Sequence, residues 1–314
     1  MHKYFIYLRT CLAGLLFVSI CSNATNLPDE LLNAPINLIS GEKTSLAEYK
    51  GKKPVYLKFW ATWCQPCREQ MPHFEHVQKE YGDSIKVIGI NLGINDDLNA
   101  INDTIKEFNL TMPMAIDESG DLAQKFRLIG TPYHLLFDRN MNLIHRGHEA
   151  SESLDNKLAL VAQTKATEVI DSQVLVESEP DIQIDTGDGE VHALFFTATW
   201  CDWYLKDSRP SASKSCIAAQ NVINDLYKKY PEISWLGVVS RLWTGEKDLL
   251  DYTNKFTVKH PIQIDKSNRL FHQYTVNDLP TLILIKDEKV ISKITSFDDV
   301  AKITSLLNGL EQPE

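Results

Sequence analysis

The 314-residue sequence lacks any run of lysine and arginine long enough to follow a phosphate backbone, and its net charge is −10. Nucleic-acid binding is therefore disfavoured. There is also no glycine-rich phosphate loop and no Ser-His-Asp arrangement on which phosphate binding or serine hydrolysis could be argued. What is present is an ordinary globular composition, 43% hydrophobic and 24% charged. The length suggests about two domains of roughly 150 residues each.

The N-terminus has no apolar run of the about 20 residues that a membrane span needs. Its apolar run, residues 11–20, is shorter, and it follows the basic residues Lys3 and Arg9. Small residues precede a cleavage point after Ala24, so residues 1–24 are expected to be a signal peptide. Removing Lys3 and Arg9, with no acidic residue, would change the charge from −10 to −12. We expect a periplasmic or otherwise exported protein; retention of the segment as a membrane anchor is the less favoured alternative.

Cysteine is scarce, with six in the whole chain. Two of the six, at positions 11 and 21, would leave with the signal. Cys64, Cys67, Cys201 and Cys216 remain, an even number in a chain destined for a compartment where disulfides persist.

Alternating strand and helix patterns predict an α/β fold. In the first part of the chain, strands are expected at 55–60, 85–90, 115–116, 133–137 and 143–145. A short helical turn is expected at 44–49, and helices at 68–81, 98–108, 122–126 and 154–165. Pro72 lies inside the first long helix, so a kink is expected there.

The second part of the chain repeats this order. Ala61-Thr62-Trp63-Cys64 recurs as Ala198-Thr199-Trp200-Cys201. A helix at 216–230, a strand at 235–239, a helix at 248–256 and a strand within 278–285 match their counterparts in the first part. We therefore expect a signal peptide (1–24) and two tandem domains, 27–165 and 166–314, each with a central mixed β-sheet flanked by helices. The linker should lie between 166 and 190.

The most informative stretch is Trp63-Cys64-Gln65-Pro66-Cys67, placed where a buried strand turns into a helix. A helix N-terminus stabilises a thiolate, so the pKa of Cys64 should fall below the free value of about 8.5. Cys67 lies one turn on, where it could attack a mixed disulfide formed at Cys64. Pro66 stiffens the turn and omits an N–H that a helix start can spare. Disulfide exchange needs this set, with Cys64 exposed.

Other interpretations of the pair are less favoured. Zinc wants four ligands, and only His73 is a nearby extra candidate, so neither a metal nor a cofactor is expected. A purely structural disulfide would close so small a loop that it would stabilise little. His73 and His76 are three residues apart on one helix, but they are expected to face solvent.

Phe59 to Cys67, together with Pro72 and Gly130-Thr131-Pro132, closely resembles the thioredoxin superfamily. The narrower resemblance, over about 34–162, is to the TlpA/ResA-like exported thiol-disulfide oxidoreductases of bacteria. It implies a thioredoxin fold, Cys64 as nucleophile and Cys67 as resolving thiol. It also implies that the Thr131–Pro132 bond is cis, which places backbone beside the sulfurs to pair with a client chain.

Two positions depart from the family pattern. Lys58 stands where many thioredoxins carry a buried Asp, and Gln70 stands where many TlpA/ResA-like proteins carry Glu. Both acids are proposed to manage the proton of the resolving thiol, so the proton route here is open. Lys58 either points toward the sulfurs, which would favour thiolate and a more oxidising disulfide, or extends to the surface.

Cys201 and Cys216 occupy the two positions of the repeated motif, but fourteen residues separate them where the first pair has two. Leu279-Pro280 matches Thr131-Pro132. The second pair could be a structural disulfide pinning the inserted loop, a second redox pair, or free thiols or a metal site. A loop of this length would stabilise by about 3 kcal/mol.

The sequence thus predicts an extracytoplasmic thiol-disulfide oxidoreductase that reduces protein disulfides through Cys64 and Cys67. Trp63, Pro66, Thr131 and Lys58 are its supporting residues. The resemblance further implies protein substrates with disulfides and recharging by a membrane electron donor. The alternatives are an oxidase or isomerase of the same class, and a thiol-based copper-handling or binding module.

Overall fold

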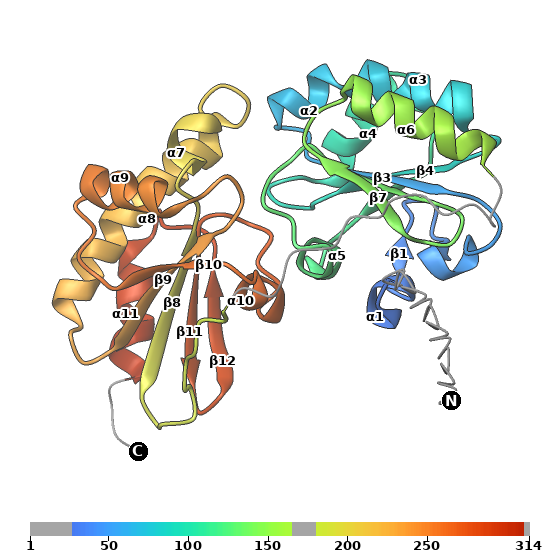
Figure 1. Cartoon of the computed structure of the whole chain (residues 1–314). Coiled ribbons are helices and arrows are strands. Elements are labelled where there is room, and N and C mark those ends of the chain that lie inside the picture. The colour runs from blue at the N-terminus through green and yellow to red at the C-terminus, as the bar shows by residue number, and fades with distance from the viewer. Residues whose placement is uncertain (1–26, 165–179, 311–314) are drawn as a thin grey trace, which may run out of the picture.

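The computed structural model describes residues 27–164 and 180–310, which we call the first half and the second half (Figure 1). Each half is built around its own five-stranded mixed sheet. The predicted signal, residues 1–24, and the predicted linker up to residue 179 lie outside the described residues. Across the two halves, no helix is both long enough and apolar enough to cross a membrane.

The sheet of the first half has the strand order β5-β4-β3-β6-β7. The central strand β3 (Val55–Trp60) pairs in parallel with β4 (Lys86–Asn91), which pairs in parallel with β5 (Met114–Ile116). On its other side β3 pairs antiparallel with β6 (Tyr133–Phe137), and β6 with β7 (Leu143–Gly147). All six residues of β3 are buried, including Lys58, the one charged residue in an otherwise apolar and aromatic strand.

Both faces of this sheet are covered. Phe74, on α3 (Met71–Tyr81), contacts Tyr56 on one face, and Phe126, which follows α5 (Asp121–Lys125), contacts Phe59 on the other. Helix α6 (Glu152–Gln163) lies beside α3, above the sheet in Figure 1, where His73 meets Asp155. The α/β fold predicted for this part of the chain is confirmed, with small shifts at element ends.

Short elements and capped helices complete the first half. The capped helix α4 (Leu98–Glu107) begins where the Asp97 carboxylate accepts a hydrogen bond from the amide of Ala100, at 2.8 Å. The N-terminal elements are α1 (Asp29–Leu32), β1 (Ile36–Asn37), β2 (Lys43–Thr44) and the 3₁₀ turn η1 (Leu46–Glu48). The turn expected at 44–49 is therefore present.

The long helix predicted at 68–81 is interrupted. Helix α2 (Gln65–Glu69) ends at Gln70, and α3 begins at Met71. The kink predicted at Pro72 thus lies slightly earlier, because a proline ring clashes with the carbonyl four residues before it and cannot donate to it.

The second half repeats the arrangement, with strand order β10-β9-β8-β11-β12 and the same sequence of parallel and antiparallel pairings. Its strands are β8 (Val191–Thr197), β9 (Ser234–Ser240), β10 (Ile262–Asp265), β11 (Thr281–Lys286) and β12 (Lys289–Ile294). Its helices are α7 (Cys201–Tyr204), α8 (Pro210–Lys229), α9 (Glu246–Phe256), α10 (Arg269–Gln273) and α11 (Val300–Leu310).

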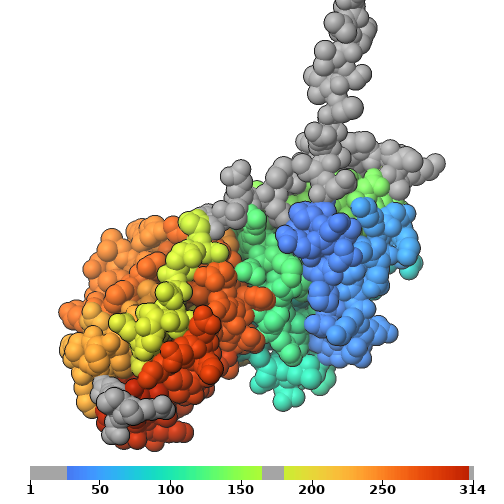
Figure 2. All heavy atoms as spheres, turned by 90° about the horizontal axis from the view of Figure 1, so that it is seen from below, coloured from blue at the N-terminus to red at the C-terminus, as the bar shows by residue number. Residues whose placement is uncertain are grey.

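The two faces of β8 enter different hydrophobic clusters, since side chains alternate along a strand. Ala193 and Phe195 pack with residues of α8 and α11. Leu194 and Phe196 belong instead to the cluster that contains the core of the first half. The halves therefore share buried apolar surface, and Figure 2 shows them in contact side by side.

One predicted boundary is wrong. The helix expected at 216–230 begins six residues earlier, at Pro210, so that much of the residues inserted between the second pair of cysteines is helical. Pro210 has the backbone φ that a first helical position needs. The Ser213 hydroxyl anchors the added turn by donating to the carbonyl of Asp202, at 2.5 Å.

Candidate functional site

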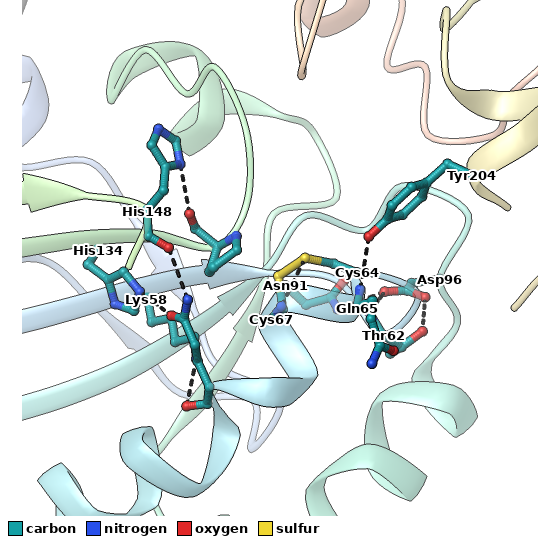
Figure 3. Close-up of a disulfide and its surroundings, with 12 residues drawn as sticks. Lys58, Thr62, Cys64, Gln65, Cys67, Asn91, Asp96, His134, His148 and Tyr204 are labelled. Atoms are coloured by element: carbon teal, nitrogen blue, oxygen red, sulfur yellow. Dashed lines mark hydrogen bonds between the residues drawn. A yellow bond between two sulfur atoms is a disulfide. The ribbon is translucent and has the colours of Figure 1, made fainter. Parts of the chain in front are cut away.

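The first cysteine pair lies where β3 ends and α2 begins, and the structure joins it as a disulfide with a Cα–Cα distance of 5.2 Å (Figure 3). Cys64 is the N-cap of α2, and its sulfur accepts a hydrogen bond from the amide of Cys67, at 3.3 Å. Pro66 occupies the start of the helix, where its missing N–H costs nothing. The sequence predicted this local geometry correctly.

A cis peptide bond joins Thr131 to Pro132, as the resemblance implies. The Pro132 carbonyl lies 2.9 Å from His148 Nδ1, which fixes the loop to the segment after β7. The Thr131 hydroxyl is buried and has no hydrogen-bond partner among the described residues. The second half has a matching cis bond between Leu279 and Pro280.

Lys58 is fully buried, so the expectation that it might extend to the surface is wrong. Its amine donates to the Gln70 carbonyl at 3.1 Å and lies 5.2 Å from the centre of the Phe74 ring. Burial lowers the pKa of Lys58 from 10.5 to about 7. The Gln70 carbonyl also accepts the amide hydrogen bond of Phe74 in α3, at 3.1 Å, so Lys58 is its second donor.

The side chain of Gln70 continues the same network. Its carbonyl oxygen lies 2.7 Å from His134 Nε2, while its amide nitrogen donates to the His148 carbonyl at 3.1 Å. His134 Nδ1 lies 2.6 Å from the Tyr56 hydroxyl. Because an amide oxygen can only accept, Nε2 carries the proton and Nδ1 accepts from the tyrosine. Burial, and then the charge of Lys58, lower the pKa of His134 well below its usual value, which keeps it neutral.

Both positions that lack the family's acids therefore belong to one buried network with His134. His134 was not predicted from the sequence. The antiparallel pairing of β3 with β6 places it directly opposite Lys58, and no local motif encodes that pairing.

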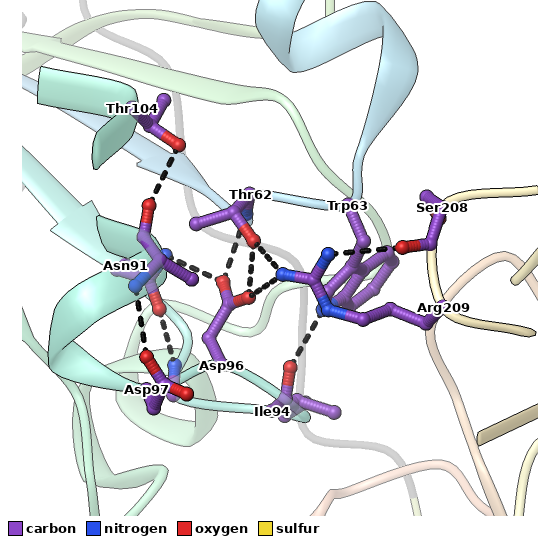
Figure 4. A network of polar contacts seen from close by, with 11 residues as sticks. Thr62, Trp63, Asn91, Ile94, Asp96, Asp97, Thr104, Ser208 and Arg209 are labelled. Carbon is purple, nitrogen blue, oxygen red and sulfur yellow. Dashed lines mark hydrogen bonds and ion pairs between the residues drawn. The ribbon is translucent and has the colours of Figure 1, made fainter. Parts of the chain in front are cut away.

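A second network fixes the turn before Cys64 (Figure 4). The Asp96 carboxylate accepts hydrogen bonds from the Thr62 amide and the Asn91 side chain, each at 2.8 Å, and from the Thr62 hydroxyl. The Trp63 indole donates to the Ile94 carbonyl at 2.6 Å. Asp96 was not predicted from the sequence, since it lies on a loop 32 residues after Cys64.

The cysteine side chains are not exposed: both Cys64 and Cys67 are 0% accessible. The expectation of an exposed nucleophile is therefore wrong for this arrangement of the chain. Residues of the second half cover the pair, and the hydroxyl of Tyr204 accepts a hydrogen bond from the amide of Gln65, at 3.0 Å (Figure 3).

Cys201 and Cys216 also form a disulfide, with a Cα–Cα distance of 6.1 Å. Cys201 begins α7 and Cys216 lies within α8, and both are buried. The structure therefore contains a disulfide at this pair, and the free-thiol alternative is wrong. Within 27–164 and 180–310, no three His, Cys, Asp or Glu residues gather as a metal site.

A mixed sheet that ends in a Cys-X-X-Cys disulfide, at a helix start and beside a conformationally fixed cis-proline loop, defines the class of thiol-disulfide oxidoreductases. Comparison with known proteins agrees. Residues 27–146 match the model of the AhpC/TSA family. The thioredoxin-like protein YneN of Bacillus subtilis is 37% identical over 131 residues, which are 40% of this chain and 74% of that protein.

The thiol-disulfide oxidoreductase ResA of Bacillus thuringiensis is 30% identical over 132 residues, 41% of this chain and 75% of ResA. The solved structure of StoA from Bacillus subtilis is 27% identical, covers 39% of this chain and 92% of StoA, and has a TM-score of 0.34. The chain belongs to the thioredoxin-like family of thiol-disulfide oxidoreductases. These matches span about two fifths of the chain.

Proposed function

We propose that this enzyme is an extracytoplasmic reductant of protein disulfides that works through Cys64 and Cys67. The observation that carries the proposal is the Cys64–Cys67 disulfide at the β3–α2 junction, on a chain related to thiol-disulfide oxidoreductases. Cys64 is the attacking thiol, because its sulfur occupies the N-cap and accepts the Cys67 amide hydrogen bond. Such a bond favours a thiolate over a thiol.

The reaction is a two-step exchange. The Cys64 thiolate attacks one sulfur of a client disulfide, forming a mixed disulfide and releasing the other client sulfur as a thiolate, which takes up a proton. The Cys67 thiolate then attacks Cys64, breaking the mixed disulfide and forming the Cys64–Cys67 bond. The client has gained two electrons and two protons, and the enzyme has lost them.

Lys58 carries a positive charge at the position where many thioredoxins carry the negative charge of a buried Asp. With a pKa of about 7, it is partly charged at neutral pH. A positive charge on the strand that leads into Cys64 favours the thiolate form and makes the pair more oxidising. Lys58→Met should therefore lower the reduction potential of the Cys64–Cys67 pair.

The second half is proposed to be a divergent thioredoxin-like domain. Its strand order, its cis Leu279–Pro280 bond and the repeated Ala-Thr-Trp-Cys sequence support this. The domains are then 27–165 and 166–314, behind a signal peptide cleaved after Ala24. Export to the periplasm or an equivalent compartment would require a membrane electron donor to return the Cys64–Cys67 pair to its reduced form.

Two measurements test the proposal. The reduction potential of the Cys64–Cys67 pair should lie well below about −120 mV, the strongly oxidising end of the range. A value at or above that limit would instead favour an oxidase. A Cys67→Ser variant expressed in the native compartment should retain client proteins as mixed disulfides on Cys64, with Cys64→Ser as the matched control. A purified protein that carries stoichiometric metal and fails to reduce insulin would favour the copper-handling alternative.

A further inference from the structure

The second half of the chain covers the surface around Cys64. Both sulfur-bearing side chains are 0% accessible, although they lie at the edge of the first half where a client must reach them. A segment of the second half, residues 200–209, lies over them; we call it the lid segment. It contains Trp200, helix α7 and the turn that leads to Arg209.

Aromatic stacking provides the centre of the contact. The Trp63 ring stacks on Trp200 with centroids 5.0 Å apart and an interplanar angle of 26°. Tyr204 and Trp243 meet the Trp63 ring edge-on, at 6.3 and 5.8 Å. The Trp63 side chain is only 2% exposed. Aromatic pairs of this kind stabilise beyond the area they bury, so the contact is specific rather than incidental.

Polar contacts surround the aromatic centre. The Arg209 guanidinium donates to the Thr62 hydroxyl at 2.5 Å and lies 3.3 Å from the Asp96 carboxylate (Figure 4). The Asp96 side chain is 0% exposed, so this ion pair is shielded from solvent on its acidic side. On the other flank, the Tyr204 hydroxyl accepts the Gln65 amide hydrogen next to Cys64.

Backbone hydrogen bonds then join the halves in an approximately two-fold manner. The Trp243 amide donates to the Ile129 carbonyl, and the Asn95 amide donates to the Asn277 carbonyl, each at 2.8 Å. Ile129 and Asn277 stand three residues before the two cis-prolines, so the same loop of each half receives the same bond. The Asn95 side chain also accepts from the Leu279 amide, at 2.9 Å.

The second disulfide braces this lid segment. Tyr204 and Arg209 both lie in the loop that the Cys201–Cys216 bond closes. The bond ties α7 to α8, and Ser213 ties the same two helices through the Asp202 carbonyl. Cys201 and Cys216 are 0% and 2% exposed, which suits a brace better than a pair that must meet an external thiol.

We propose that the second half covers Cys64 as a lid. The Cys201–Cys216 disulfide holds the lid segment in its closed position by positioning Tyr204 and Arg209. This inference rests on the proposed role of Cys64 as the attacking thiol. Clients then reach Cys64 only after the halves separate locally, and the equilibrium of that opening sets the apparent reactivity of the enzyme. The second cysteine pair has a structural part in this scheme and exchanges no electrons.

The test is the alkylation rate of Cys64 by iodoacetamide in the full chain carrying Cys67→Ser, which leaves Cys64 a free thiol beside an intact Cys201–Cys216 bond. Rates are measured over a range of pH, so that the midpoint reports the pKa of Cys64 and the plateau reports access. Adding Cys201→Ser and Cys216→Ser should raise the plateau about tenfold or more. Adding Tyr204→Phe instead should raise it about fivefold, because one hydrogen bond across the contact is lost.

Lys206→Ala is the matched control, since Lys206 is an exposed residue of the same lid segment; its plateau should equal that of Cys67→Ser alone. An unchanged plateau in the Tyr204→Phe variant, which keeps every cysteine of the second half, would overturn the proposal even if the cysteine variants misfold. Because the alkylation assay needs no client, it tests the lid separately from the proposed reductase activity. A chain that reduces no disulfide can still show a covered Cys64, and an active reductase can show an uncovered one.

Discussion

Lys58 offers a quantitative test, because it is a buried amine that contacts the Gln70 carbonyl and the Phe74 ring. Its folded-state pKa of about 7 lies below its unfolded value of 10.5. Between these values the unfolded chain holds a proton on Lys58 that the folded chain does not, so stability rises with pH. The whole shift corresponds to about 5 kcal/mol, at about 1.4 kcal/mol for each pH unit. Between pH 7 and 9 the folded protein should gain about 2 kcal/mol from this one group, because Lys58 is already half deprotonated in the folded chain at pH 7.

The change to make is Lys58→Met, which keeps an apolar chain of similar length and removes the titrating amine. The free energy of unfolding of the variant should lack the Lys58 contribution, so the difference between variant and wild type should shrink or reverse as pH rises from 7 to 9. Other strongly shifted groups do not interfere. The pKa of His145 falls from 6.5 to about 4 and that of Asp117 rises from 3.8 to about 6, so both titrate below pH 7.

The assay is urea unfolding of the oxidised chain from Thr25 onward, which lacks Cys11 and Cys21, at pH 7, 8 and 9. Lys50→Met serves as the control, since Lys50 is exposed and should change the pH dependence little. If wild type and Lys58→Met show parallel pH profiles, Lys58 is not a buried amine of lowered pKa and the description of its network is wrong.

Three further substitutions test other contacts. Gly89→Ala places a Cβ 2.3 Å from the Met114 sulfur and 3.2 Å from the Phe74 ring, so it should destabilise the first half by about 1–3 kcal/mol in urea unfolding; an unaffected midpoint would mean that this core is loosely packed. Asp97→Ala removes the cap of α4 and should cost about 1 kcal/mol, with Asp97→Asn close to wild type. Gly130→Ala places a Cβ 2.7 Å from the Trp243 indole, so it should speed Cys64 alkylation in the Cys67→Ser background; an unchanged rate would speak against the closed lid.

Much of the fold of the first half could be predicted from its sequence. The run at 55–60 is apolar except for Lys58, and its length and aromatic content favour the central strand that is observed over a buried helix. Pro72 correctly predicted an interruption in the helix that follows. The start of α8 could not be predicted, because the Ser, Ala and Lys residues after Pro210 are compatible with either a loop or a helix.

The site was predicted only as far as local spacing reaches. Cys64, Cys67 and the cis-proline loop follow from short motifs. His134 and Asp96 could not be found that way, because strand pairing and a distant loop bring them to the site. The burial of Cys64 depends on contacts across more than 130 residues of chain, such as Gln65 with Tyr204, and no local pattern encodes such a contact.

The most direct test of the central claim is a single-turnover reaction. The fully reduced chain, freed of reductant, is mixed with a peptide disulfide, quenched in acid, and mapped for its disulfides and for client thiols. We expect two client thiols to form for each Cys64–Cys67 bond, in wild type and in the Cys201→Ser/Cys216→Ser variant, and we expect Cys64→Ser to abolish the reaction. Client reduction that persists in Cys64→Ser, or that oxidises only Cys201 and Cys216, would contradict this expectation.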